Sequence, residues 1–267
     1  MSDLRQGRWQ EVLADVAHVD ALICDPPYSA RTHMGIGTGW HPGGAESRPY
    51  KLAPIVYDHW ADPDAVEFVR AWAPRTRGWM VVMSDHETAL TLQQTMRDQG
   101  RYVFAPLPFI EMGKQPRVNG DGPASWTCWI VVSRPREKRF MSWGSLPGAY
   151  IPAVGPGTRD RVIKGGKPLW LMRALVRDYS RQDDLVCDPF VGGGTTLLAS
   201  DIEHRKAVGA EQDAATYKLA KARLSKGFTP SLFVEEPGRT TTRHSAQLGL
   251  PLAERCPVLF SSEDDSE

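Results

Sequence analysis

The sequence lacks the closely spaced cysteines that a metal site or a disulfide framework needs. Its four cysteines, Cys24, Cys128, Cys187 and Cys256, lie far apart and form no C-x-x-C motif. The triplet Asp85-His86-Glu87 has no partner ligands at helical spacing. This pattern argues against a zinc site and against a small secreted domain held by disulfides. We therefore predict a protein that binds no metal and works in a reducing compartment, the cytoplasm.

Long apolar runs and an excess of one charge sign are also missing. Residues 1–16 contain no apolar core of the signal-peptide kind, and no apolar run is long enough to cross a bilayer. We therefore expect no membrane partner. Lys plus Arg and Asp plus Glu number 32 each, so any surface that binds a polyanion must be a local patch.

The chain does contain short apolar runs that alternate with amphipathic segments. Strands are predicted at 21–24, 79–83, 185–187 and 206–210, and helices at 9–16, 62–74, 84–100, 169–179, 195–204 and 214–225. Asp62 before Pro63 is typical of a helix N-cap, and Ser84 with Glu87 has the spacing of a capping box. The alternation predicts an α/β fold with a doubly wound, mostly parallel sheet that helices cover on both faces.

The remaining segments predict additions to this sheet. Two apolar runs, 102–110 and 126–132, flank a Gly- and Pro-rich stretch and predict an antiparallel hairpin at the sheet edge. Residues 29–54 are rich in glycine and predict a long loop. Residues 134–166 show little periodicity and predict a compact insertion. We expect one domain over residues 1–230, which includes this insertion, and a polar tail over 231–267.

A glycine-rich turn stands between the predicted strand 185–187 and the helix that follows it. It reads Asp188-Pro189-Phe190-Val191-Gly192-Gly193-Gly194-Thr195-Thr196. Consecutive glycines let backbone N–H groups approach a ligand at the positive end of the next helix. Glu211 follows the next predicted strand, where a carboxylate can hold the ribose hydroxyls of an adenosine ligand. By itself such a turn suits a dinucleotide site or a plain tight turn equally well.

A second motif, Asp25-Pro26-Pro27-Tyr28, directly follows the predicted strand 21–24. The two prolines fix two φ angles and remove two N–H donors, so the turn is stiff. A structural turn would also be stiff, but the residue choice fits chemistry on a base amine. Such an amine is a poor nucleophile, and Asp25 and the Pro26 carbonyl can accept its two hydrogens. Tyr28 can stack on a base rotated out of a duplex.

Together, the two motifs resemble those of DNA methyltransferases that act on exocyclic amines. The catalytic motif precedes the cofactor motif, as in the circularly permuted beta class of that family. The resemblance covers residues 4–30 and 165–225. It implies a Rossmann-like fold, S-adenosyl-L-methionine as the methyl donor, double-stranded DNA as the substrate and a bacterial or phage-infected cell as the location.

The resemblance also implies roles for single residues. Asp25, Pro26, Pro27 and Tyr28 would be catalytic. The donor would be bound by Lys167, Asp188, Pro189, Phe190, Gly192, Gly193, Gly194, Thr195, Thr196 and Glu211. Lys167 would help to hold the methionine part and Glu211 the ribose. Gly193 departs from the serine that is common in the family, a change that we expect to cost little.

Two segments combine basic and aromatic side chains that suit DNA. The insertion interleaves its cations with Phe140, Trp143 and Tyr150, which we expect to contact phosphates and stack on displaced bases. The loop after Tyr28 is a second candidate for closing over DNA. The predicted DNA-binding residues are Arg31, His33, Arg134, Arg136, Lys138, Arg139, Arg159 and Arg161.

Several alternatives remain open. Aspartate at position 25 favours adenine N6 as the target, whereas the cytosine N4 branch more often has serine there. A catalytically silent module that binds the donor and DNA is a different class of function, and a nicotinamide dehydrogenase is a third. No hydride-handling His or Lys arrangement supports the dehydrogenase. The sequence is also compatible with a homodimer.

Overall fold

The structure is a computed structural model that describes residues 2–30, 38–40, 49–51, 59–111, 126–152, 162–163 and 165–227. Residues 38–40 and 49–51 are described by their backbone alone. All these residues belong to one unit, Met1–Pro237. The predicted tail, 231–267, and parts of the predicted loop and insertion lie outside the described residues.

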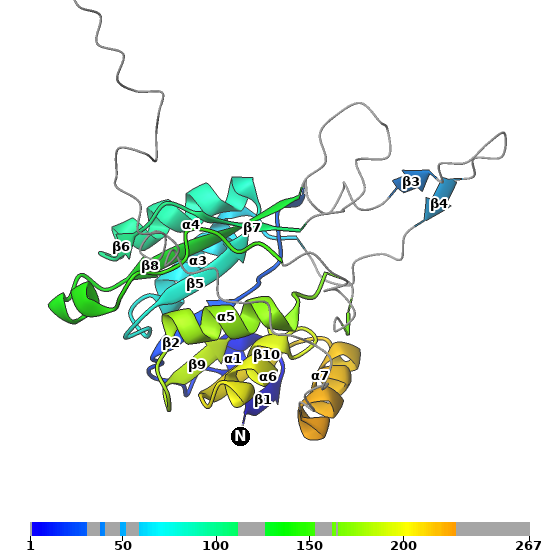
Figure 1. The fold of residues 1–267 in the computed structure, drawn as a ribbon. Coiled ribbons are helices and arrows are strands. Elements are labelled where there is room, and N and C mark those ends of the chain that lie inside the picture. Colours follow the sequence, from blue (N-terminus) through cyan, green and yellow to red (C-terminus); the bar gives the residue numbers. More distant parts are fainter. Residues whose placement is uncertain are drawn as a thin grey trace, which may run out of the picture. The chain divides into compact units, whose positions relative to one another are not determined.

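Five parallel strands form most of the described sheet (Figure 1). They are β1 (Asp3–Gln6), β2 (Ala21–Cys24), β5 (Met80–Ser84), β9 (Leu185–Asp188) and β10 (Lys206–Glu211). The strand order is β1-β10-β9-β2-β5-β8-β6, in which β8 (Thr127–Arg134) runs antiparallel to β5. Both β6 (Tyr102–Val103) and β7 (Leu107–Ile110) pair antiparallel with β8. The doubly wound, mostly parallel sheet and its antiparallel edge are thereby confirmed.

The strands bury both of their faces because successive side chains point to opposite sides. On one side, Ile23, Val81 and Val186 pack in a cluster with α5 (Leu169–Tyr179) and α6 (Thr195–Ile202). On the other side, Leu22 and Val82 pack with α1 (Trp9–Val12), α3 (Asp62–Trp72) and α4 (His86–Asp98). The last helix, α7 (Ala214–Lys226), packs beside β1 and α6.

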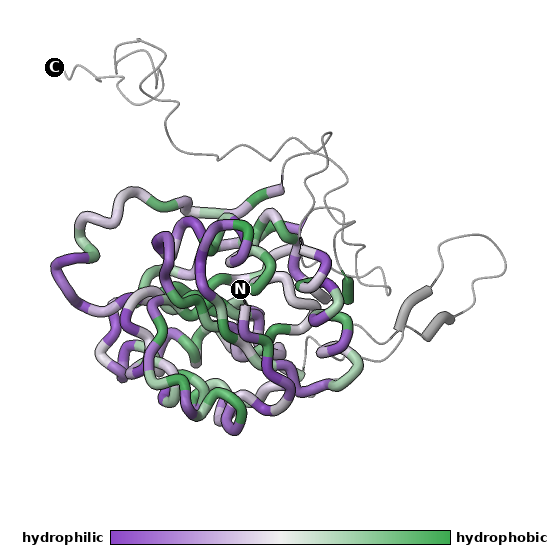
Figure 2. Tube along the Cα trace, turned by 90° about the horizontal axis from the view of Figure 1, so that it is seen from below, coloured by the Kyte–Doolittle hydropathy of each residue, from purple (hydrophilic) through white to green (hydrophobic). Residues whose placement is uncertain are grey.

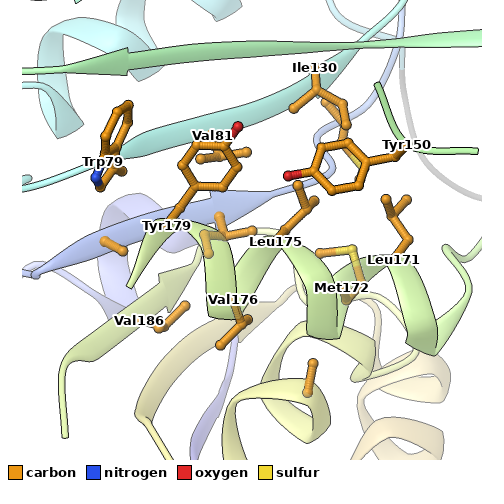
Figure 3. Close-up of a cluster of buried hydrophobic side chains, with 14 of the residues drawn as sticks. Trp79, Val81, Ile130, Tyr150, Leu171, Met172, Leu175, Val176, Tyr179 and Val186 are labelled. Carbon is orange, nitrogen blue, oxygen red and sulfur yellow. The ribbon is translucent and has the colours of Figure 1, made fainter. Parts of the chain in front are cut away.

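The core under α5 shows how its sequence period determines its orientation. Leu171, Met172, Leu175, Val176 and Tyr179 recur at helical spacing and are all at most 1% exposed. Figure 3 shows these side chains pointing from the helix towards the strands, where Val81, Ile130 and Val186 meet them. Hydrophobic residues run through the interior of the described chain and hydrophilic ones occupy its outer turns (Figure 2).

Helix starts differ from their predicted positions by one residue. The N-cap of α3 is Ala61, not Asp62, and the Asp64 carboxylate accepts a hydrogen bond from the Ala61 N–H at 2.8 Å. Ser84 belongs to β5, so the N-cap of α4 is Asp85, which accepts from Thr88 N at 2.9 Å. In both places a carboxylate satisfies an N–H group that the first helical turn leaves without a partner.

Other differences arise where the sequence pattern is weak. The edge strand β1 has the sequence DLRQ, which shows no apolar alternation. Within the predicted loop 29–54, β3 (Thr38–Trp40) and β4 (Pro49–Lys51) form an antiparallel pair, which corrects the expectation of a continuous loop. In the predicted insertion, a short 3-10 helix, η2 (Lys138–Ser142), is the regular element of the described part. No helix among the described residues is long and apolar enough to cross a membrane.

The parallel strands bring the ends of distant segments to one edge of the sheet, which we call the catalytic edge. It carries the residues after β2, β5, β9 and β10, namely Asp25, Asp85, Pro189 and Gln212. In open α/β sheets, ligands bind at this carboxyl edge. Because β8 runs the other way, its last residue, Arg134, lies at the opposite edge, beside the start of β5.

Candidate active site

A cavity of about 360 Å³ opens at the catalytic edge. The two predicted motifs both line it, which places the turn at Asp25 and the glycine turn against the same space although they are far apart in the chain. The predicted site residues that line it are Asp25, Pro27, Lys167, Asp188, Pro189, Phe190, Gly192, Gly193, Thr195, Thr196 and Glu211. The volume and the mixed polar and apolar lining suit a ligand of nucleoside size.

Asp25 is the centre of a small polar cluster. Its Oδ2 accepts a hydrogen bond from the Lys167 ammonium at 2.5 Å, and its Oδ1 accepts one from the Tyr28 hydroxyl at 2.8 Å. The Tyr28 hydroxyl also lies 2.8 Å from the Cys128 Sγ. The Lys167 ammonium lies 5.0 Å from the centre of the Tyr28 ring, within cation–π range. The Asp25 side chain remains 24% exposed, so the carboxylate is accessible from the cavity.

Burial and charge control the protonation of this cluster. Burial alone would lower the pKa of Lys167, but the Asp25 carboxylate beside it more than compensates and the pKa is raised. Burial, with a smaller contribution from Asp25, raises the pKa of Tyr28 well above its ordinary value. Burial likewise raises the pKa of the Cys128 thiol. Near neutral pH the cluster therefore contains a charged ammonium, a neutral phenol and a neutral thiol.

The glycine turn owes its shape to two residues with positive φ. Gly192 has φ +53° and Gly194, the N-cap of α6, has φ +81°, values that L side chains rarely adopt. Gly194 also packs against Ala220 of α7, where an added Cβ would lie 3.3 Å from the alanine Cβ. At Gly193 an added Cβ would lie 3.3 Å from Cγ1 of Ile163, so glycine at this position leaves room for that side chain.

Asp188 lies beneath the turn and is 1% exposed. Its Oδ1 accepts a hydrogen bond from Phe190 N at 2.9 Å. Burial raises the pKa of Asp188 to about 7, and hydrogen bonds from Thr196 and Phe190 oppose that rise only in part. The carboxyl group therefore changes its charge within the physiological pH range.

Glu211 connects the end of β10 to the glycine turn. Its Oε2 accepts from Gly192 N at 2.9 Å and its Oε1 from Asp213 N at 2.8 Å. Burial raises the pKa of Glu211, while these backbone hydrogen bonds lower it. A carboxylate oxygen has a second lone pair, so both oxygens can still accept hydrogen bonds from a ligand.

The two threonines after the turn have protein partners. Thr195 Oγ1 accepts a hydrogen bond from Arg223 at 2.8 Å, and Arg223 also donates to the Gly193 carbonyl at 3.1 Å. Thr196 hydrogen-bonds Asp188. Both threonines line the cavity, but their described hydrogen bonds hold the turn together.

Four of the predicted DNA-binding residues lie away from this cavity. Arg134 stacks on the ring of Tyr102 at 4.8 Å, and Arg139 pairs with Glu137 at 2.8 Å. Arg134 is the last residue of β8, and Arg136, Lys138 and Arg139 follow it, so the structure does not bring these residues to the catalytic edge. Arg31, His33, Arg159 and Arg161 lie outside the described residues.

The aromatic residues of the predicted insertion belong to the core. Phe140 and Tyr150 are 6% and 4% exposed, and Trp143 packs against the same cluster. Trp143 also donates a hydrogen bond from its indole N–H to the Asp178 carbonyl at 2.8 Å. Phe140 and Tyr150 are therefore unavailable for displaced bases, which corrects that expectation, and the partly buried Trp143 ring is covered by the Arg181 guanidinium at 3.6 Å.

Several cavity residues were not predicted as site residues from the sequence. Gly7, Arg8 and Trp9 reach the cavity because β1 pairs with β10 and places Gln6 beside Glu211. The others are Ile163, Gly165, Gly166, Met172, Val191, Ala210, Gln212, Asp213 and Thr216. A recognised β1 would have indicated the first three, because its end must lie at the same edge. In the part of the chain that the structure describes, no three His, Cys, Asp or Glu side chains form a group that could hold a metal ion.

A parallel sheet with a glycine turn, an acidic turn and one cavity at its carboxyl edge defines an α/β enzyme that binds a nucleoside-type cofactor. The family model of N6/N4 methyltransferases, described as DNA methylase, matches residues 126–222. The Type II methyltransferase M2.MboI of Moraxella bovis is 38% identical over 245 residues, which cover 80% of this chain and 83% of that protein. M.HindIII of Haemophilus influenzae is 41% identical over 129 residues, which cover 46% of this chain and 41% of that protein.

Solved structures share the fold. The complex of M1.HpyAVI with SAM superimposes with a TM-score of 0.60 at 19% identity and covers 84% of this chain and 99% of that chain. The cytosine-N4-specific PvuII DNA methyltransferase has a TM-score of 0.60 at 14% identity and covers 88% of each chain. At these identities the superpositions confirm the Rossmann-like methyltransferase fold that the sequence predicts.

The chain therefore belongs to the N6/N4 DNA methylase family. It is a site-specific DNA methyltransferase that uses S-adenosyl-L-methionine and modifies an exocyclic base amine. The family resemblance and the cofactor predicted from the two motifs are thereby confirmed.

Proposed function

We propose that the chain methylates adenine N6 in double-stranded DNA on a base rotated out of the duplex. The observation that carries the proposal is that Asp25, aspartate rather than serine, faces the same cavity as the glycine turn. Asp25 accepts one hydrogen of the base amine and the Pro26 carbonyl accepts the other, which makes the nitrogen lone pair available. In this proposal the Tyr28 ring, whose centre lies 5.0 Å from the Lys167 ammonium, stacks on the base.

The donor site in this proposal consists of residues that line the cavity. Gly192 and Gly193 let the turn approach the ligand closely, Gly194 gives the turn its shape behind them, and Pro189 and Phe190 surround the ligand. Glu211 accepts hydrogen bonds from the ribose hydroxyls. When bound, S-adenosylmethionine supplies a methyl group that its sulfonium sulfur makes electrophilic. The negatively charged Asp25 carboxylate stabilises the positive charge that develops on the amine nitrogen as the methyl group is transferred.

The DNA in this proposal approaches the catalytic edge. Three segments that are undescribed in whole or in part begin and end there, between Ala30 and His59, between Glu111 and Trp126, and between Pro152 and Val162. The sequences between them contain Arg31, His33, Arg159 and Arg161, which remain our proposed DNA contacts. Arg134, Arg136, Lys138 and Arg139 at the other edge are not part of this surface. The catalytic domain spans residues 1–230 in this scheme and the tail spans 231–267.

Isotope-resolved mass spectrometry tests the choice of base. Double-stranded DNA is incubated with the protein and a methyl-deuterated donor, digested to nucleosides and analysed. We expect labelled N6-methyladenine as the product. Labelled N4-methylcytosine alone would establish the alternative target, and the absence of any labelled base with intact donor binding would establish a silent binding module.

Lys167→Met should weaken donor binding selectively. In the proposed site the Lys167 ammonium, 9% exposed, pairs with Asp25 and with the methionine carboxylate of the donor. We expect the dissociation constant for the donor to rise about 10- to 100-fold, the loss of a buried charge-assisted hydrogen bond. The affinity for 5′-methylthioadenosine, which lacks the amino-acid part, should change less than about threefold, because Lys167 makes no contact with that part of the molecule.

Calorimetric titration measures both ligands. Lys206→Met, at the exposed start of β10 on the opposite edge, is the matched control and should leave both affinities unchanged. Equal weakening of both ligands by Lys167→Met would show that Lys167 supports the cavity as a whole and does not recognise the methionine carboxylate.

A further inference from the structure

The catalytic turn has few backbone donors of its own. Strand β2 ends at Cys24, and Pro26 and Pro27 have no N–H groups. The next contacts that fix the turn occur after the prolines. Trp60 donates its backbone N–H to the Tyr28 carbonyl at 3.0 Å, and Ser29 donates its backbone N–H to the Asp85 Oδ2 at 2.8 Å.

Among the described residues, the Asp85 carboxylate accepts hydrogen bonds from Ser29 and from Thr88. Its Oδ1 accepts from Thr88 N at 2.9 Å, which caps α4. Its Oδ2 accepts from both Ser29 N at 2.8 Å and the Ser29 hydroxyl at 2.5 Å. Asp85 is 8% exposed and directly follows β5, the parallel neighbour of β2. The carboxylate thus connects the catalytic turn to the start of a packed helix.

Capping alone does not explain a carboxylate at this position. Ser, Thr and Asn cap helices about as well as Asp, and burying a carboxylate costs free energy unless donors compensate it. Asp213 caps α7 through Thr216 N at 2.7 Å without contacting the catalytic turn, so a cap needs only one of its oxygens. At Asp85 the second oxygen accepts the two Ser29 donors, and only a carboxylate offers acceptors for all three.

The aromatic packing around Trp60 supports the same turn from the donor side. The Trp60 ring lies 5.2 Å from Phe190 of the glycine turn and 5.3 Å from Phe68 of α3. Trp60 thereby joins the catalytic turn to the donor motif, while Asp85 joins it to α4. Asp85 accepts from Ser29, the residue after Tyr28, so the two anchors hold the same peptide group, Tyr28–Ser29, directly after the prolines.

We propose that Asp85 is a positioning residue for methyl transfer, which holds the Asp25–Tyr28 turn in place through Ser29. This inference rests on the proposed function, because it assigns the turn to catalysis. Asp85 contacts neither reactant in this scheme. Its contribution is to keep the acceptors of the turn within the small tolerance that an aligned transfer requires, since a displacement of about 1 Å can slow a reaction about 100-fold.

Asp85→Asn tests the contact between Asp85 and Ser29 while it preserves the N-cap of α4. The asparagine oxygen can still accept from Thr88 N, but its amide N–H group would then face the Ser29 N–H donor. We expect the single-turnover rate constant of methyl transfer to fall about 30- to 300-fold. The dissociation constant of S-adenosylmethionine should stay within about threefold of wild type, because Asp85 does not line the donor cavity. A general loss of stability would instead lower the rate constant and raise the dissociation constant together.

Ser29→Ala provides a second, milder variant. It removes the hydroxyl donor and keeps the backbone donor, so we expect a fall in rate of about 3- to 10-fold. The double variant should be no slower than Asp85→Asn alone, because both substitutions break one interaction. Asp64→Asn is the matched control, an exposed carboxylate at the start of α3, and should react at the wild-type rate.

Rapid-quench assays with a tritiated donor measure these rates, and titration calorimetry measures donor affinity. A wild-type rate in either Asp85→Asn or Ser29→Ala would overturn the proposal, as would a double variant in which the two losses multiply. These outcomes can be distinguished from a failure of the proposed function, the methylation of adenine. If the wild-type protein transfers the label to cytosine N4, adenine is refuted as the target. The same variants then measure how the contact between Asp85 and Ser29 affects the rate of transfer to the cytosine amine.

Discussion

Asp25→Ala should lower the turnover number for methyl transfer about 100- to 1,000-fold, the range seen when a preorganised transition-state contact is removed. In the proposed mechanism the Asp25 carboxylate accepts a hydrogen bond from the base amine and stabilises the positive charge that develops on the amine nitrogen. The affinity for the donor should change less than tenfold, because the glycine turn and Glu211 remain. Steady-state kinetics with duplex DNA and calorimetric titration with the donor measure the two effects separately.

Two further variants distinguish chemistry from structure. Asp25→Ala leaves the Lys167 ammonium, 9% exposed, without its 2.5 Å partner, which costs stability in its own right. The double variant Asp25→Ala, Lys167→Met removes that unpaired charge and should be as inactive as Asp25→Ala. Asp25→Asn keeps an acceptor but no charge, so its activity should lie between Asp25→Ala and wild type. More than a tenth of wild-type activity in Asp25→Ala would contradict the assigned role.

Asp188→Asn should weaken donor binding about 30- to 100-fold at pH 8 and remove its pH dependence, since a contact with a charged group is worth about 2 to 3 kcal/mol. S-adenosylmethionine is positively charged at its sulfonium and ammonium groups, which the ionised Asp188 attracts. Because the pKa of Asp188 is about 7, wild-type affinity for the donor should rise as the pH goes from 6 to 8. Asp98→Asn, on the exposed face of α4, is the control and should keep the wild-type profile.

The same substitution should stabilise the protein without ligand. The pKa of Asp188 rises from 3.8 to about 7 on folding. Its protonation therefore contributes stability below pH 3.8 that is lost as the pH rises through about 7. Asp188→Asn does not incur this loss, so its free energy of unfolding at pH 8 should exceed that of wild type by about 2 to 4 kcal/mol, with a smaller gain at pH 5. Denaturant titration at both pH values checks the sign, and a destabilised variant at pH 8 would contradict it.

Local sequence patterns predicted the elements that surround the site. Strand β2 is short, apolar and fully buried, and β9 is buried except at Leu185. Gly192 and Gly194, between β9 and α6, adopt the positive φ values that their residue type permits. Since parallel strands align their carboxyl ends, the motifs after β2 and β9 could be expected at one edge. The periodicity of α5 likewise predicted the face that it buries.

Long-range contacts were not predictable in the same way. The ion pair of Lys167 with Asp25 joins residues 142 positions apart, and no local pattern encodes such a pairing. The basic residues after β8 were assigned to DNA from composition alone. Their position at the opposite edge follows from the antiparallel direction of β8, which composition does not reveal. Phe140 and Tyr150 were misassigned because interleaved cations resemble a stacking surface, whereas both rings complete the core.

A crystal structure of the protein with duplex DNA and a non-transferable donor analogue tests the central claim most directly. We predict an extruded adenine whose amine nitrogen lies about 3 to 3.5 Å from the group that replaces the methyl, the approach distance of aligned reactants. The amine should donate hydrogen bonds to Asp25 and to the Pro26 carbonyl, with the analogue seated against Gly192 and Glu211. An analogue bound elsewhere, or a base that enters from the edge at Arg134, would contradict the account.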